Sequence, residues 1–277
     1  MGPILTAPLT WSPDPGRVMP VYVVAIHYAP GAGEAMAGAL AEALGNTLYE
    51  ARARLSDPAG GPAVVGTFAE IEPAWAFAGR LRANGIAPIL LTPEEVESEA
   101  QRFLVRSFQL GDHGVTAASR RGETLELAYP EIQVVLRGVQ VEERTEIKRT
   151  ETKKFSPGRF LLTGGLLLTK TTRKAVQVTT EDREDFLHLY ADRGPALVFR
   201  AGALKYQSLG QALRPSTLAN FVYLVDFFRH AATQARFDDR LTNRQARARL
   251  LGPSLTENHL DVAVSLLARV LRGGAPR

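Results

Sequence analysis

The pattern of apolar residues changes near residue 100, and this change constrains the fold more than any other feature of the sequence. In residues 21–92, short β-branched runs alternate with stretches of helical period. In residues 103–200, short β-rich runs follow one another with turn signals between them. Helices that alternate with strands cover a sheet, whereas consecutive strands pair with one another. The sequence therefore predicts an α+β protein whose 277 residues form two different domains.

The first domain is predicted to be a small α/β sandwich over residues 21–92. Gly45 stands where a first helix would end, and Asn46 or Thr47 can cap the next one. The expected order is strand, helix, helix, strand, helix, strand, over 21–28, 34–44, 48–55, 63–68, 70–83 and 86–91. The preceding residues 1–20 are rich in proline and predict a flexible leader, without the apolar run of a signal peptide.

This first domain resembles the C-terminal domain of the bacterial ribosomal stalk protein. The features that carry the resemblance are the order of elements, Gly45 followed by Leu48-Tyr49-Glu50-Ala51-Arg52, and Asn84-Gly85 before the last strand. The resemblance implies that fold for about a quarter of the chain. In that family, lysines on the first two helices recruit translational GTPases, whereas residues 34–55 contain no lysine. A ferredoxin-like arrangement of the same elements remains open.

The rest of the chain is predicted to be a linker, a β domain and terminal helices. Residues 93–102 are acidic and favour a short helical linker. Residues 103–235 predict an antiparallel β domain with a basic insertion at 144–174, closed by an amphipathic helix over 215–233. Residues 236–277 predict an Arg-rich helix over 236–249 and an amphipathic helix over 255–272.

The β domain resembles a bacterial pleckstrin-homology-like domain over about residues 102–235. Gly114-Val115-Thr116, the run from Leu125 to Ile132 and the closing helix carry this resemblance. It implies an antiparallel sheet with one C-terminal helix. Members that bind phosphoinositides carry basic residues in the first strand–strand loop, which is Gly-Asp-His-Gly here at 111–114. An anion site would therefore use residues 144–174.

Charge is distributed unevenly along the chain. Residues 1–101 hold 5 basic and 11 acidic residues, and the remaining residues hold 28 and 18, which gives the total of +4. The segment 144–174 holds nine basic residues against Glu146 and Glu151, a net of +7. The candidate binding residues in it are Lys148, Arg149, Lys153, Lys154, Arg159, Lys170, Arg173 and Lys174.

Several hypotheses for this segment remain open. Its charge favours an anionic partner, but lysine along an exposed strand also prevents edge-to-edge pairing. Residues 159–170 are mostly apolar with a central Gly-Gly, and predict either two buried strands or a hairpin that dips into a membrane with anionic lipid. Arg240, Arg244 and Arg247 would share one face of a helix and offer a second phosphate-binding surface.

The sequence argues against most catalytic chemistry. The chain has no cysteine, and its five histidines show no pair with the spacing of zinc ligands. It has no nucleophile elbow, and Gly31-Ala32-Gly33 lacks the Lys-Ser or Lys-Thr of a phosphate loop. We therefore expect no cofactor, no metal and no catalytic residues, although distant residues can still assemble a site.

The resulting hypothesis is a bacterial, cytoplasmic, non-enzymatic adaptor or regulator that acts through contacts with another protein. The alternative is a module that binds anionic membrane surfaces or nucleic acid through residues 144–174. The C-terminal amphipathic helix offers a further surface for a second copy of the chain.

Overall fold

The computed structural model describes residues 21–155, 169–256 and 258–273, with residues 142–181 described at the level of the backbone. The chain divides into two compact units. Unit 1 comprises residues 1–97 with 248–277, and unit 2 comprises residues 98–247. Both contain helices and strands, which confirms the α+β class.

Unit 1 is built on a three-stranded antiparallel sheet in the order β2-β1-β3. Its elements follow the predicted sequence of strand, helix, helix, strand, helix, strand. They are β1 (Tyr22–Ile26), α1 (Gly33–Leu44), α2 (Leu48–Arg54), β2 (Ala63–Phe68), α3 (Ile71–Ala83) and β3 (Pro88–Leu91).

Local signals set the helix boundaries in unit 1. Gly45 ends α1 with a left-handed φ of 66°, a conformation that glycine adopts without steric cost. Thr47 caps α2, because its hydroxyl accepts from the Glu50 backbone N–H while the Glu50 carboxylate accepts from the Thr47 N–H. The core between sheet and helices is apolar and includes Val24, Leu40, Phe77 and Leu81.

The last helix, α7 (Leu260–Gly273), belongs to unit 1 although the sheet and the first three helices of this unit precede residue 98. Its Ser265 hydroxyl accepts a hydrogen bond from the Glu97 N–H, and Arg269 donates to the Leu90 carbonyl and pairs with Glu95 at 2.8 Å. Eight of its side chains are buried, so the apolar face expected from the sequence is covered within the chain. None of the described helices has both the length and the apolar character needed to cross a bilayer.

Unit 2 contains a seven-stranded sheet in the order β10-β7-β8-β9-β4-β5-β6. Its strands are β4 (Phe103–Leu110), β5 (Gly114–Ser119), β6 (Thr124–Ala128), β7 (Ile132–Phe155), β8 (Thr169–Ala191), β9 (Leu197–Arg200) and β10 (Arg236–Leu241). Most neighbours are antiparallel, as expected. However, β10 runs parallel to β7 and β9 runs parallel to β4, so the sheet is mixed rather than wholly antiparallel.

Helix α5 (Thr217–Ala231) packs on this sheet and closes its core. Phe221, Leu224 and Phe228 of α5 are fully buried against strand residues that include Leu187 and Phe199. The predicted helix over 215–233 is therefore confirmed. Single 3-10 turns lie at Pro93–Glu95, Glu99–Gln101 and Tyr129–Glu131, and a longer 3-10 segment interrupted at Gly210 spans Gln207–Ala212.

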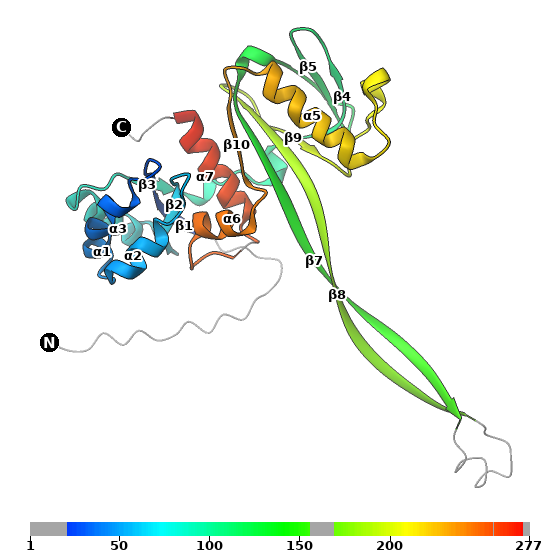
Figure 1. The fold of residues 1–277 in the computed structure, drawn as a ribbon, viewed down its shortest axis with the longest axis horizontal. Coiled ribbons are helices and arrows are strands. Elements are labelled where there is room, and N and C mark those ends of the chain that lie inside the picture. The colour runs from blue at the N-terminus through cyan, green and yellow to red at the C-terminus, as the bar shows by residue number, and fades with distance from the viewer. Residues whose placement is uncertain (1–20, 156–168, 257, 274–277) are drawn as a thin grey trace. The chain divides into compact units, whose positions relative to one another are not determined.

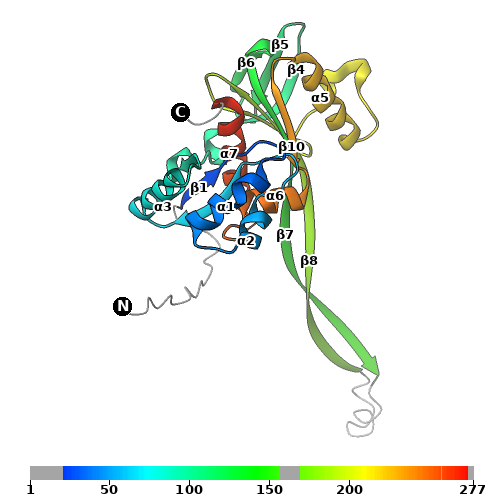
Figure 2. The ribbon, with the colours of Figure 1, turned by 60° about the vertical axis from the view of Figure 1, so that its left-hand side comes forward.

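Strands β7 and β8 extend far beyond the rest of the sheet. The pairing of β10 with β7 ends at Gly138, and the pairing of β9 with β8 ends at Phe186. Residues 139–155 and 169–185 then pair only with each other and form a projecting two-stranded ribbon, which we call the arm (Figures 1 and 2). At roughly 3.3 Å per residue the arm is about 55 Å long.

The structure corrects the prediction for residues 236–249. This segment is not one helix, because Arg236–Leu241 forms strand β10 and only Arg244–Leu251 forms a helix, α6. Pairing with β7 buries Asp238 and Leu241 and outweighs the local helical pattern. Arg240 therefore does not share a helical face with Arg244 and Arg247, and Arg247 is buried, donating to the Val139 carbonyl.

Candidate functional site

The arm brings the two basic stretches of the sequence together. Residues 144–154 belong to β7 and residues 170–174 belong to β8, and the register places Lys154 opposite Lys170 and Glu151 opposite Arg173. The predicted binding residues therefore lie along one ribbon, except Arg159, which falls outside the described residues. The apolar segment 159–170 also falls mostly outside them.

Register and alternation divide these positions between the two faces of the ribbon, because directly paired residues share a face and neighbours along a strand do not. Over residues 148–155 and their partners, the positions of one face are Lys148, Thr150, Thr152, Lys154, Lys170, Thr172, Lys174 and Val176, and Glu146 precedes them on the same face. The other face is mixed: Arg149, Glu151, Lys153, Phe155, Thr169, Thr171, Arg173 and Ala175. Both faces thus carry net positive charge.

Such a ribbon is poorly stabilised on its own. An isolated two-stranded hairpin is marginal in water, and like charges on directly opposed residues, such as Lys154 and Lys170, are unfavourable. No third strand among the described residues pairs with the arm. An anionic partner would offset the repulsion, which makes the arm a candidate binding element.

A hollow of about 660 Å³ lies where the arm meets the body of unit 2. Its walls come from the base of the arm, the turn after β9 and the first turn of α5. The lining residues are Gln140, Asp182, Arg183, Glu184, Asp185, Ala201, Gly202, Ala203, Thr217 and Leu218. Three carboxylates and one guanidinium give this lining a net charge of −2, opposite in sign to the arm.

Specific contacts fix the acidic wall of the hollow. Asp185 pairs with Arg137 at 3.5 Å, and its backbone carbonyl accepts from the Ala201 N–H. A methyl group built on Gly202 would lie 3.1 Å from Glu184 Oε1, so the Glu184 carboxylate stands close to this turn. Burial, and then Asp185 and Glu184, raise the pKa of the nearby Tyr206 hydroxyl well above its ordinary value.

The other wall depends on Asn220, which the sequence analysis did not identify. Its side chain is buried, accepts from the Arg214 N–H at 2.6 Å and donates to the Arg214 and Ser216 carbonyls. Ser216 in turn caps α5 by accepting from the Ala219 N–H. These bonds hold the segment that leads into Thr217 and Leu218.

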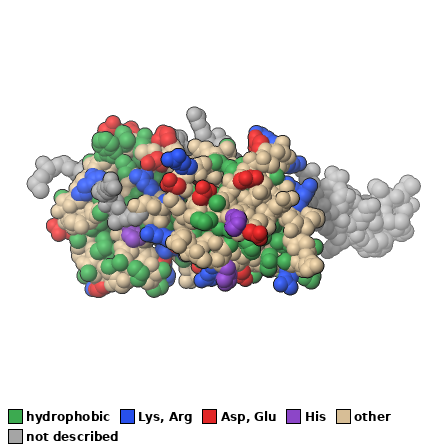
Figure 3. Space-filling view, turned by 90° about the horizontal axis from the view of Figure 1, so that it is seen from above, with side chains coloured by type: hydrophobic (Ala, Val, Ile, Leu, Met, Phe, Trp, Pro, Cys, Tyr) green, Lys and Arg blue, Asp and Glu red, His purple; other side chains and the backbone are tan. Residues whose placement is uncertain are grey.

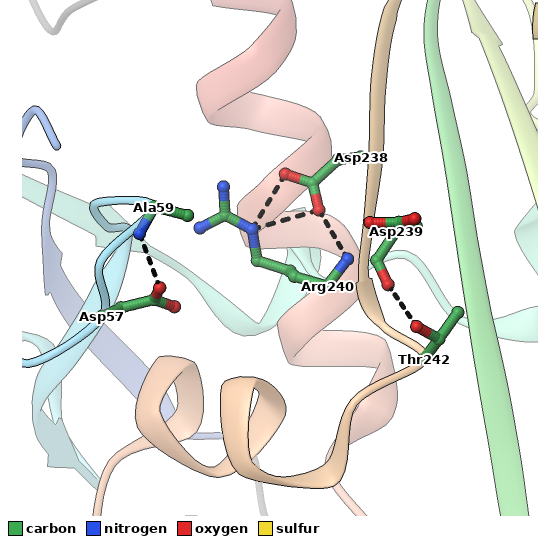
Figure 4. Close-up of polar contacts among 6 residues, drawn as sticks. All are labelled: Asp57, Ala59, Asp238, Asp239, Arg240 and Thr242. Atoms are coloured by element: carbon green, nitrogen blue, oxygen red, sulfur yellow. Dashed lines mark hydrogen bonds and ion pairs between the residues drawn. The ribbon is translucent and has the colours of Figure 1, made fainter.

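Several other polar residues make local contacts that stabilise turns and strand β10. Asp238 accepts from the Arg240 backbone and side chain, and Thr242 donates to the Asp239 carbonyl (Figure 4). Burial raises the pKa of Asp238, while Arg240 opposes the shift. Asp57 accepts from the Ala59 N–H within its own turn (Figure 4).

His188 is buried between the rings of Phe186 and Tyr190 on β8. Burial, and then Arg102 and Arg200, lower its pKa well below 6.5, which keeps the imidazole neutral. Within the part of the chain that the structure describes, no group of three or more His, Asp or Glu is placed to hold a metal ion.

On the face drawn in Figure 3, acidic and basic side chains of the described residues are interspersed rather than separated by sign.

No family model, curated protein or solved structure matches this chain. The resemblances to the stalk-protein domain and to pleckstrin-homology-like domains stay predictions. What the fold defines is an α+β protein whose sheet extends into a basic two-stranded arm.

Proposed function

We propose that this chain is a binding protein whose arm lies along the phosphate backbone of a nucleic acid. The observation that carries the proposal is the projection of β7 and β8 beyond their sheet at the residues that concentrate positive charge. Lysine and arginine bind phosphate oxygens and release counterions, which supplies most sequence-independent affinity for nucleic acid.

The dimensions of the arm suit a duplex. Its basic part, residues 144–155 with their partners, is about 40 Å long at roughly 3.3 Å per residue. One turn of B-DNA rises about 34 Å, and its major groove, about 12 Å wide, admits a two-stranded β-ribbon. The arm can therefore follow a groove for about one turn.

The distribution of charge between the two faces favours a groove over a membrane. A planar lipid surface meets one face of a ribbon, whereas the phosphates along a groove flank it on both sides. Lys148, Lys154 and Lys174 belong to one face, and Arg149 and Lys153 belong to the other. We extend the proposal to a cytoplasmic adaptor in which the arm binds nucleic acid and the rest of the chain contacts other proteins.

The test compares two variants that each lose four positive charges. The arm variant is Lys148→Gln, Arg149→Gln, Lys153→Gln and Lys154→Gln. The control variant changes four exposed arginines outside the arm to glutamine: Arg82, Arg120, Arg121 and Arg193. Binding to a fluorescent 30-base-pair duplex is measured by anisotropy between 50 and 200 mM salt, with sedimentation of phosphatidylserine vesicles in parallel.

We expect wild type and control to bind the duplex similarly, and the arm variant to bind at least tenfold more weakly. If all four residues contact phosphates, the slope of log K against log salt falls by about 3 to 4 in the arm variant. Equal losses in the two variants would contradict a role for the arm. If the wild type binds vesicles but not the duplex, the partner of the arm is a membrane rather than a nucleic acid. If it binds neither, only the hypothesis of a protein partner is left.

A further inference from the structure

The hollow at the base of the arm combines carboxylates with exposed apolar residues. Leu218 lines it and is 57% exposed, and Val222, one helical turn further along α5, is 38% exposed. Large apolar side chains exposed beside one another commonly mark contact surfaces. Helix α5 packs in the core through Phe221, Leu224 and Phe228, whereas Leu218 and Val222 remain exposed.

The acidic wall offers carboxylate oxygens beside this strip. Asp185 already has Arg137 as its partner, whereas Asp182 is exposed and Glu184 is half-buried against the turn at Gly202. Their charge selects a cation, and the planar guanidinium of arginine can bond two carboxylate oxygens at once. A volume of about 660 Å³ accommodates a long side chain together with part of a main chain.

We propose that this hollow is a docking site for an arginine-containing, partly apolar peptide segment of another protein. The arginine binds at Glu184 and Asp182, and a neighbouring apolar side chain packs on Leu218 and Val222. The inference is independent of nucleic-acid binding, because the hollow is acidic and uses none of the basic positions of the arm.

The hydrogen bonds that fix the start of α5 also contribute to the site. Asn220 and Ser216 fix the backbone that leads into Thr217 and Leu218, so the apolar strip is held in place before a partner arrives. A preorganised surface loses less conformational entropy on binding. The site is therefore expected to bind a short peptide measurably even though the buried area is small.

The probe is a fluorescein-labelled peptide of alternating leucine and arginine, six residues long, used with the full-length chain. Two control peptides replace either arginine by glutamate or leucine by serine. The site variants are Glu184→Gln and Leu218→Asp. Matched control variants are Glu126→Gln on the exposed edge strand β6 and Leu48→Asp, whose side chain is 43% exposed in unit 1.

We expect the Leu-Arg peptide to bind at least tenfold more tightly than either control peptide. Glu184→Gln and Leu218→Asp each reduce this binding fivefold or more, and Glu126→Gln and Leu48→Asp leave it within twofold. Circular dichroism establishes that each variant is folded. Equal binding of all three peptides, or equal effects of site and control variants, would overturn the proposal.

Self-association is a separate outcome of the same variants. Sedimentation velocity of the wild type at 50 mM salt detects any dimer formed by the basic arm of one copy in the hollow of another. A dimer that Glu184→Gln abolishes would identify a second copy as the occupant and overturn the proposal of a separate partner. A monomer in the wild type supports it.

Discussion

Replacing Asn220 tests whether one buried amide holds the start of α5. The side chain is 5% exposed and makes three hydrogen bonds, with the Arg214 N–H, the Arg214 carbonyl and the Ser216 carbonyl. Asn220→Ala removes all three. A net contribution of about 1 kcal/mol for each hydrogen bond sets an upper expectation near 3 kcal/mol.

Two features of the structure lower the loss of stability expected for Asn220→Ala. The Ser216 carbonyl keeps the bond from the Asn220 backbone N–H at 3.0 Å, and Arg214 is exposed, so water can reach its backbone groups. We therefore expect Asn220→Ala to lower the free energy of unfolding by about 2 kcal/mol. Asn220→Asp keeps the size but places a carboxylate against two carbonyl oxygens, and is expected to cost more than the alanine variant.

The assay must report on unit 2. Unit 2, residues 98–247, contains no tryptophan, so tryptophan fluorescence is not a direct probe of this change. Urea unfolding is monitored by far-ultraviolet circular dichroism, and hydrogen exchange with mass spectrometry measures the protection of residues 213–231. The comparison variant is Ser216→Ala, which removes only the cap bond and is expected to cost about 1 kcal/mol.

Unchanged exchange in residues 213–231, or a loss below about 0.5 kcal/mol for Asn220→Ala, would refute the reasoning. Asn220→Ala is also expected to weaken binding of the Leu-Arg peptide at the hollow, because Thr217 and Leu218 follow the segment that Asn220 holds.

Two further predictions concern stability. A methyl group at Gly138 would overlap the Phe186 ring and lie 2.8 Å from Leu241 Cβ, so Gly138→Ala is expected to lower the free energy of unfolding in urea by about 1–3 kcal/mol. Gly38 on α1 has open space around it, so Gly38→Ala is expected to raise the free energy of unfolding by about 0.5–1 kcal/mol, and equal effects of the two substitutions would refute this. The lowered pKa of His188 means that the unfolded chain takes up a proton near pH 6.5 while the folded chain does not, so stability falls on acidification below about pH 6.5. Between pH 7.5 and 5.5 wild type should lose about 1.4 kcal/mol more than His188→Leu, and parallel losses in the two proteins would contradict the assignment.

Unit 1 shows how much of a fold local chemistry can specify. Gly45, Thr47 and Glu50 place the boundary between α1 and α2, and each acts on residues within one turn of the helix. The order of its first six elements was therefore predictable. The placement of α7 beside Leu90 and Glu97 was not, because its bonds join residues more than 160 positions apart.

Strand β10 illustrates a failure of local pattern. The sequence predicts that residues 236–241 belong to an Arg-rich helix, but in the structure they form a strand that pairs in parallel with Val134 to Gly138. Leu241 is buried in this pairing, and Asp238 and Arg240, two residues apart on the strand, are hydrogen-bonded to each other. No signal within the segment itself distinguishes this outcome, since the partner strand lies about 100 residues earlier.

The two candidate sites, the arm and the hollow, differ in how far the sequence predicts them, because only the arm is formed by residues close together in the sequence. The arm is a single hairpin, so its charge and its alternation are visible in consecutive residues, and strand β7 runs through residues 144–154. The hollow draws its lining from the base of the arm, the turn at 201–203 and the start of α5. In the sequence, Asp182 and Glu184 are ordinary strand residues and Leu218 continues a core pattern. Only the folded sheet sets acidic and exposed apolar side chains beside one another, and the proposed docking site depends on that juxtaposition.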